Sequence, residues 1–94
     1  MLGRGGVAFV SLVFDTAGAL AHPPEVVSRG VLDPGSLGVA RKAALAVARA
    51  VEGATAKIRG DDDAIADIAR GAARRAIESH TGRRPLILVA VTRP

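Results

Sequence analysis

Residues 7–14, VAFVSLVF, predict a β-strand, because β-branched and aromatic residues follow one another without a charge. Gly5 and Gly6 precede this run, and the turn sequence DTAG follows it. Successive side chains of a strand point to opposite faces, and both faces are apolar here. One face has Val7, Phe9 and Val13, and the other has Ala8, Val10, Leu12 and Phe14. A strand of this kind requires cover on both sides.

Two further strands are expected. One begins at Glu25, because the preceding Pro23 and Pro24 cannot donate ladder hydrogen bonds. The other is residues 86–92, LILVAVT, which is again apolar on both faces.

Two helices are predicted between the second and third strands. The first is capped by Asp33 or Ser36 and runs to about Glu52. Residues 53–60, GATAKIRG, read as a connector. Apolar residues recur at three- and four-residue steps and predict the inward face of the first helix: Leu37, Ala40, Ala44, Val47 and Val51.

The second helix begins at the aspartates 61–63, with Asp61 as its cap. It ends at Gly82, which suits a left-handed cap, and Pro85 prevents its continuation. Its expected inward residues are Ile65, Ile68, Ala72, Ala76 and Ile77. Its expected surface ion pairs are Asp67–Arg70 and Arg74–Glu78.

These elements predict one α+β domain over residues 1–94, a three-stranded sheet with two helices packed on one face, in the order β-β-α-α-β. Ser11, Asp15 and Thr92 mark the face that the helices leave open. Its apolar residues, the predicted interface, are Val7, Phe9, Val13, Leu86, Leu88 and Ala90. Beneath the helices we expect Ala8, Val10, Leu12, Phe14, Ile87, Val89 and Val91.

Composition limits the possible functions. Nineteen alanines and two phenylalanines make a core of small side chains, which favours oligomerisation. There is no cysteine, and no apolar run has the ~20 residues that a membrane helix needs. Ser11 and Asp15 interrupt the first apolar run, against a signal peptide. We therefore expect a soluble, cytoplasmic protein.

Residues that could carry chemistry are few. The two histidines, His22 and His80, are far apart in the sequence, and His80 is expected to be a favourable charge at a helix end. The aspartates 61–63 lack the spaced glycine and closing glutamate of a calcium loop. No nucleophile elbow and no phosphate-binding loop is present. The sequence indicates no catalytic site, no metal site and no cofactor in this chain.

Residues 26–34, VVSRGVLDP, carry an unusual Ser-Arg-Gly within a strand. Gly30 fits a bulge or a close backbone approach, and Arg29 is then directed off the sheet. The segment EVVSRGVL resembles the extended segment of the C-terminal domain of bacterial ribonuclease J, where an apolar pair precedes Ser-Arg-Gly. The segment RRPLILVAV is similar to that domain's closing strand, and the order of elements matches from about Gly6 to Arg93.

The resemblance implies a parent enzyme of the metallo-β-lactamase/β-CASP family whose catalytic domains and zinc ligands are absent from this chain. Such a parent degrades RNA from its 5′ end and also cuts it internally. This chain is then its non-catalytic assembly and dimerisation domain, and its partners are a second copy, the parent's catalytic domains and, through the parent, RNA.

Two other readings stay open. A net charge of +4 allows an RNA-binding module that uses Arg29, Arg83 and Arg84, although charges spread over solvated helix faces also explain it. The third reading is a small regulatory α+β protein that stands alone, but no convergent polar cluster marks a ligand pocket.

We expect the chain by itself not to cleave 5′-monophosphorylated RNA with zinc, manganese or magnesium, because it lacks a His/Asp ligand cluster. Incubation of labelled RNA with the purified chain and each metal tests this. Metal-dependent cleavage that a mock purification does not show would contradict it.

Overall fold

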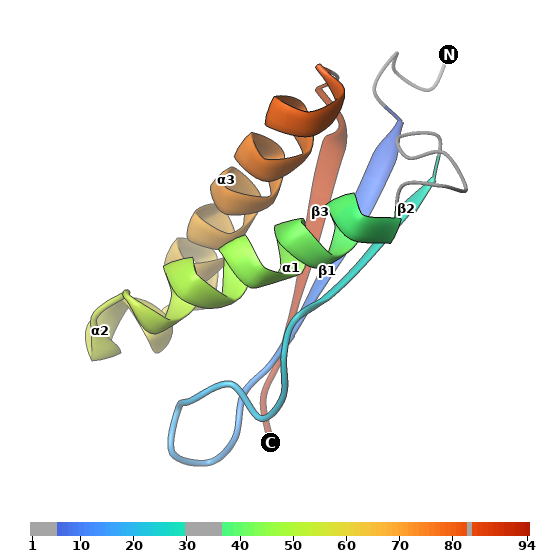
Figure 1. The fold of residues 1–94 in the computed structure, drawn as a ribbon. Coiled ribbons are helices and arrows are strands. Elements are labelled where there is room, and N and C mark those ends of the chain that lie inside the picture. Colours follow the sequence, from blue (N-terminus) through green and yellow to red (C-terminus); the bar gives the residue numbers. More distant parts are fainter. Residues whose placement is uncertain (1–5, 30–36, 83) are drawn as a thin grey trace.

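The central strand of the sheet is β1 (Val7–Val13), the strand that is apolar on both faces. In the computed structural model, which describes residues 6–29, 37–82 and 84–94, the strand order is β2-β1-β3. Strand β2 (Glu25–Arg29) runs antiparallel to β1, and β3 (Leu86–Thr92) runs parallel to it. The sheet is therefore mixed, and Figure 1 shows its strong twist.

The predicted α+β class and the order β-β-α-α-β are confirmed, with one short helix added. The two long helices are α1 (Leu37–Glu52) and α3 (Asp62–Thr81). Between them, where the sequence predicts a connector, lies α2 (Ala56–Arg59). Its turn closes because the Thr55 hydroxyl accepts a hydrogen bond from the Ile58 N–H at 3.2 Å. The prediction of a connector without a helix was wrong. Gly53 and Gly60 on either side favour a loop, but the residues between them form a single capped helical turn.

Both long helices pack on one face of the sheet (Figure 1). Helix α1 contacts β2, α3 contacts β3, and the two helices contact each other over β1. The buried core combines the even-numbered residues of β1 with one stripe from each helix and one residue of β3. Its members are Ala8, Val10, Leu12, Phe14, Ala43, Val47, Val51, Ile65, Ala69, Ala72, Ala73, Ile77 and Ile87.

The inward stripe of the first helix differs from the prediction. Ala43 is fully buried, whereas Ala40 and Ala44 are half-buried. In α3, Ala69 and Ala73 are buried where Ile68 was expected. Sequence periodicity selects one helix face, but each helix packs against both the sheet and the other helix. Small side chains occupy that junction because they allow close approach.

The two ends of α3 are capped as expected. Asp61 has an extended backbone, and its Oδ1 accepts a hydrogen bond from the Ala64 N–H at 3.1 Å. At the other end Gly82 has φ 71°, in the left-handed region that glycine enters without strain, and its N–H donates to the Glu78 carbonyl at 2.8 Å. Pro85 is buried directly before β3. The candidate caps of the first helix, Asp33 and Ser36, lie outside the described residues, as does Gly30.

The diproline interrupts the ladder between β1 and β2. Phe14 pairs with Leu20 in an isolated bridge, while Ser11 pairs with Glu25. The segment from Leu20 to Glu25 therefore carries two more residues than the part of β1 that it faces. This bulge confirms that the second strand begins at Glu25, because prolines are tolerated where ladder pairing breaks.

Two surface ion pairs were predicted for α3. The Asp67–Arg70 pair is present, and the prediction of an Arg74–Glu78 pair is wrong. Glu78 instead pairs with the Nε of Arg84, at 3.3 Å. Arg84 lies beyond the end of α3, so helical spacing alone does not predict this contact.

Arg93, directly after β3, contacts residues near the end of β1 and near the start of α3. Its guanidinium carbon lies 4.6 Å from the centre of the buried Phe14 ring. Its Nε donates to Asp62 Oδ1 at 2.7 Å, and its Nη2 donates to the carbonyl oxygen of Arg59. These contacts join the ends of β1 and β3 to the turn before α3.

We expect Arg93→Ala to lower the free energy of unfolding by about 1–3 kcal/mol, because it removes a cation–π contact and two charge-assisted hydrogen bonds. Arg84→Ala is the matched control, since its exposed ion pair with Glu78 is worth under about 1 kcal/mol. Urea unfolding followed by circular dichroism measures both. Equal losses for the two variants would contradict the role given to Arg93.

Candidate functional site

The face of the sheet opposite the helices carries exposed apolar side chains. Exposed fractions there are 47% for Phe9, 57% for Leu86 and 43% for Leu88. The complementary residues of β1 and β3 lie beneath the helices: Ala8, Val10, Leu12, Phe14 and Ile87 are buried, and Val89 and Val91 are half-buried. The predicted division of the two faces is confirmed, whereas the use of the open face as an interface stays a prediction.

One row of residues crosses all three strands on this face. Phe9 pairs with Val27 of β2 and with Leu88 of β3, so the three side chains lie side by side. Val27 is 55% exposed, and sequence reasoning missed it. The signal is present in the sequence, because the partners of an antiparallel pair lie on the same face of the sheet.

The apolar character is concentrated at the end of the sheet where β1 begins. Beside the Val27–Phe9–Leu88 row lie Val7, half-buried, and its partner Leu86. We call these five residues the sheet-face patch.

Polar residues border the patch toward the other end of the face. Ser11 pairs there with Glu25 and Ala90, and Val13 pairs with Thr92. Of the six residues predicted for the interface, the patch contains Val7, Phe9, Leu86 and Leu88. The other two, Val13 and Ala90, lie on the same face at its polar end.

The arginines proposed for RNA or interdomain contacts do not gather in the part of the chain that the structure describes. Arg83 and the side chain of Arg29 lie outside it. Arg84 is exposed and lines a shallow hollow with Arg74 and Pro85. For the hypothesis of RNA binding, the described chain therefore offers this one small basic site near the end of α3.

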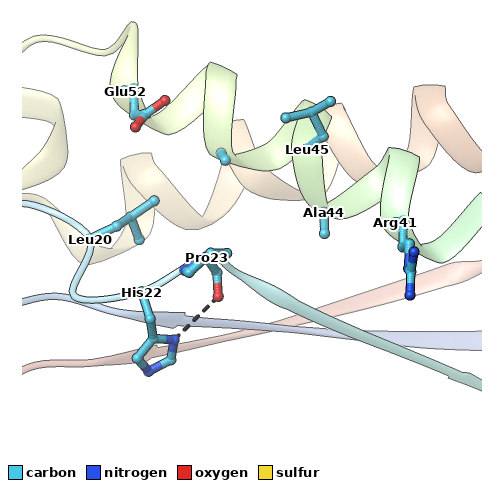
Figure 2. A pocket seen from close by; sticks show the side chains of 8 residues that line it. Leu20, His22, Pro23, Arg41, Ala44, Leu45 and Glu52 are labelled. Atoms are coloured by element: carbon cyan, nitrogen blue, oxygen red, sulfur yellow. Dashed lines mark hydrogen bonds between the residues drawn. The ribbon is translucent and has the colours of Figure 1, made fainter.

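A groove runs between α1 and the segment before β2 (Figure 2). Its two charged residues, Arg41 and Glu52, lie at opposite ends of the helix segment that lines it. The His22 Nδ1–H donates to the Pro23 carbonyl oxygen at 3.2 Å. Apolar side chains fill the space between these polar groups: Leu20, Ala44, Leu45 and Ala48. The groove shows no convergent polar groups of the kind that bind and orient a substrate.

His80 lies in the last turn of α3, the helix end where the sequence places it, and its role as a favourable charge there stays a prediction. Its Nε2 lies 3.3 Å from the Nζ of Lys42 on α1, and its Nδ1 lies 2.9 Å from the Ala76 carbonyl oxygen. The ring therefore links α1 to α3.

Across residues 6–29, 37–82 and 84–94, no three His, Cys, Asp or Glu side chains lie close enough together to hold a metal ion. Among the described helices, none combines the length and the hydropathy needed to cross a bilayer.

The profile of the family described as Ribonuclease J C-terminal domain matches residues 1–94, the whole chain. A comparison with curated proteins gives no match.

Two leucines on opposite faces of the sheet test the division into core and open surface. Leu12→Ala should lower the free energy of unfolding by about 2–5 kcal/mol, because Leu12 is fully buried. Leu88→Ala should cost less than about 1 kcal/mol at low protein concentration, since Leu88 is largely in water already. Urea unfolding at micromolar concentration compares them. A loss for Leu88→Ala as large as that for Leu12→Ala would make the open face part of the core.

Proposed function

The chain belongs to the family of ribonuclease J C-terminal domains, and from this membership we propose that it is a non-catalytic assembly domain that dimerises through the sheet-face patch. A ribonuclease J is by name an enzyme of RNA cleavage, so the role proposed for this domain is to hold and position catalytic parts carried elsewhere in the parent.

The Val27–Phe9–Leu88 row is the observation that carries the proposal. Burying one Phe or Leu side chain completely is worth roughly 1.5–3 kcal/mol, and these side chains are about half exposed. A two-fold dimer uses the same patch twice, so several such half-buried side chains contribute together. Polar Ser11 and Glu25 beside the patch form the rim that such interfaces have.

The parent enzyme supplies the chemistry in this proposal. Its metallo-β-lactamase and β-CASP domains hold zinc and degrade RNA from the 5′ end and internally, in the cytoplasm. Dimerisation of the C-terminal domain then keeps two catalytic units in one particle, which raises the local concentration of active sites along one RNA.

The second candidate function is RNA binding at the hollow of Arg74, Arg84 and Pro85. Arg84 already pairs with Glu78, and the exposed Phe9 lies on the sheet, so no aromatic platform accompanies these arginines in the described chain. RNA affinity at this hollow falls steeply with salt, whereas an apolar interface persists.

We expect Phe9→Asp to weaken self-association at least about tenfold, because a charge in each copy enters the apolar contact. The far-ultraviolet circular dichroism should stay unchanged, since Phe9 lies outside the core. Leu45→Asp is the matched control, as Leu45 is an equally exposed apolar side chain on α1. Sedimentation velocity of the three proteins measures association.

Two outcomes would overturn the proposal. In one, the unmodified chain stays monomeric at about 100 μM, where a dimer with an association free energy of roughly −5.5 kcal/mol would be populated. In the other, Leu45→Asp disrupts association as strongly as Phe9→Asp.

A further inference from the structure

The direction of the backbone groups in β3 follows from two hydrogen bonds. The Leu86 N–H donates to the Gly6 carbonyl at 3.0 Å, and the Phe14 N–H donates to the Thr92 carbonyl at 2.9 Å. Backbone groups alternate in direction along a strand, so the even-numbered residues of β3 face β1. The N–H and C=O groups of Ile87, Val89 and Val91 therefore point away from the sheet, and they have no hydrogen-bond partner within the described residues.

Strand β2 forms the opposite edge of the sheet and has features that hinder pairing with another strand. The bond from the Ala21 N–H to the Val13 carbonyl shows that odd-numbered residues of β1 face β2, which leaves the groups of Val26 and Ser28 at the outer edge. This edge is short and begins after the diproline bulge. The strand starts with Glu25 and ends with Arg29. Such features hinder pairing with another chain.

Strand β3 has none of these protections. It is seven residues long, LILVAVT, without a proline or a charge. An uncharged edge of this length is a template for another strand.

The edge of β3 is complementary to itself. When two copies run antiparallel about Val89, Ile87 of each copy meets Val91 of the other and the two Val89 residues meet at the axis. Each hydrogen-bonded pair exchanges two bonds, so these three pairs give roughly six. Shifting the axis toward the start of the strand brings in Pro85, which has no N–H to donate.

We propose that β3 is a second contact surface, which pairs edge to edge with β3 of another copy around a two-fold axis at Val89. The inference shares with the proposed function the idea of self-association, but it uses backbone groups of the edge rather than side chains of the sheet-face patch. The paired sheets form one six-stranded sheet, with all long helices on one side and both patches on the other. Edge pairing therefore leaves the patch available.

A single cysteine at the axis tests the pairing. The chain has no cysteine of its own, and Val89 is half-buried on the helix side of the sheet. Opposed residues of a hydrogen-bonded antiparallel pair have Cα atoms about 5.5 Å apart, within the range that a disulfide spans. The control is Val26→Cys, which is also half-buried, on the same face and at the outer edge of β2.

Under mild oxidation we expect Val89→Cys to give at least about tenfold more disulfide-linked dimer than Val26→Cys, because paired thiols have a far higher effective concentration than colliding ones. The cross-link should also form when Phe9→Asp is present, which separates the edge from the patch. Equal cross-linking of the two cysteine variants, or loss of the Val89 cross-link on adding Phe9→Asp, would overturn the inference.

Hydrogen exchange of the unmodified chain gives an independent measurement. At about 100 μM the amides of Ile87, Val89 and Val91 should be protected to a similar degree as those of Leu86 and Leu88, and dilution should remove that protection selectively. Fast exchange of the three odd-numbered amides at every concentration would show that the edge stays unpaired. The outward amides of Val26 and Ser28 exchange fast in either case.

Discussion

The structure depends on one constraint: the central strand is apolar on both faces, while the long helices cover one. The even-numbered side chains of β1 lie beneath α1 and α3 and are almost inaccessible to water. The odd-numbered ones, which include the exposed Phe9, lie on the opposite face. Hydrophobic burial is the main favourable term in folding, and here the fold uses half of the central strand. The other half is the surface that we propose for association.

The rest of the architecture follows from the small core. Alanines at the junction of the two helices allow close packing but bury little apolar surface each. Polar contacts at the ends of the elements therefore matter: Asp61 and Gly82 cap α3, and Arg93 joins β1, β3 and the start of α3. Small domains with little core are often stabilised by oligomerisation, which is consistent with the assembly role proposed for this one.

Local chemistry was predictable from the sequence, whereas contacts between distant segments were not. The alternation around Ser11 and Thr92 identified the open face, and the turn residues identified both caps of α3. Val27 joined the patch only through the register of β1 with β2. Glu78 pairs with Arg84 and His80 contacts Lys42, and both partners come from other segments of the chain. The single turn of α2 was too short to produce a periodic pattern.

The central claim is that apolar surface holds copies of this chain together, and the salt dependence of self-association tests it most directly. Sedimentation equilibrium of the unmodified chain between low and high sodium chloride gives the dissociation constant at each concentration. An apolar and backbone-paired interface predicts a dimer whose dissociation constant stays constant or falls as salt rises. A dissociation constant that rises steeply with salt, or a monomer throughout, would contradict the account, because charge contacts are the ones that salt screens.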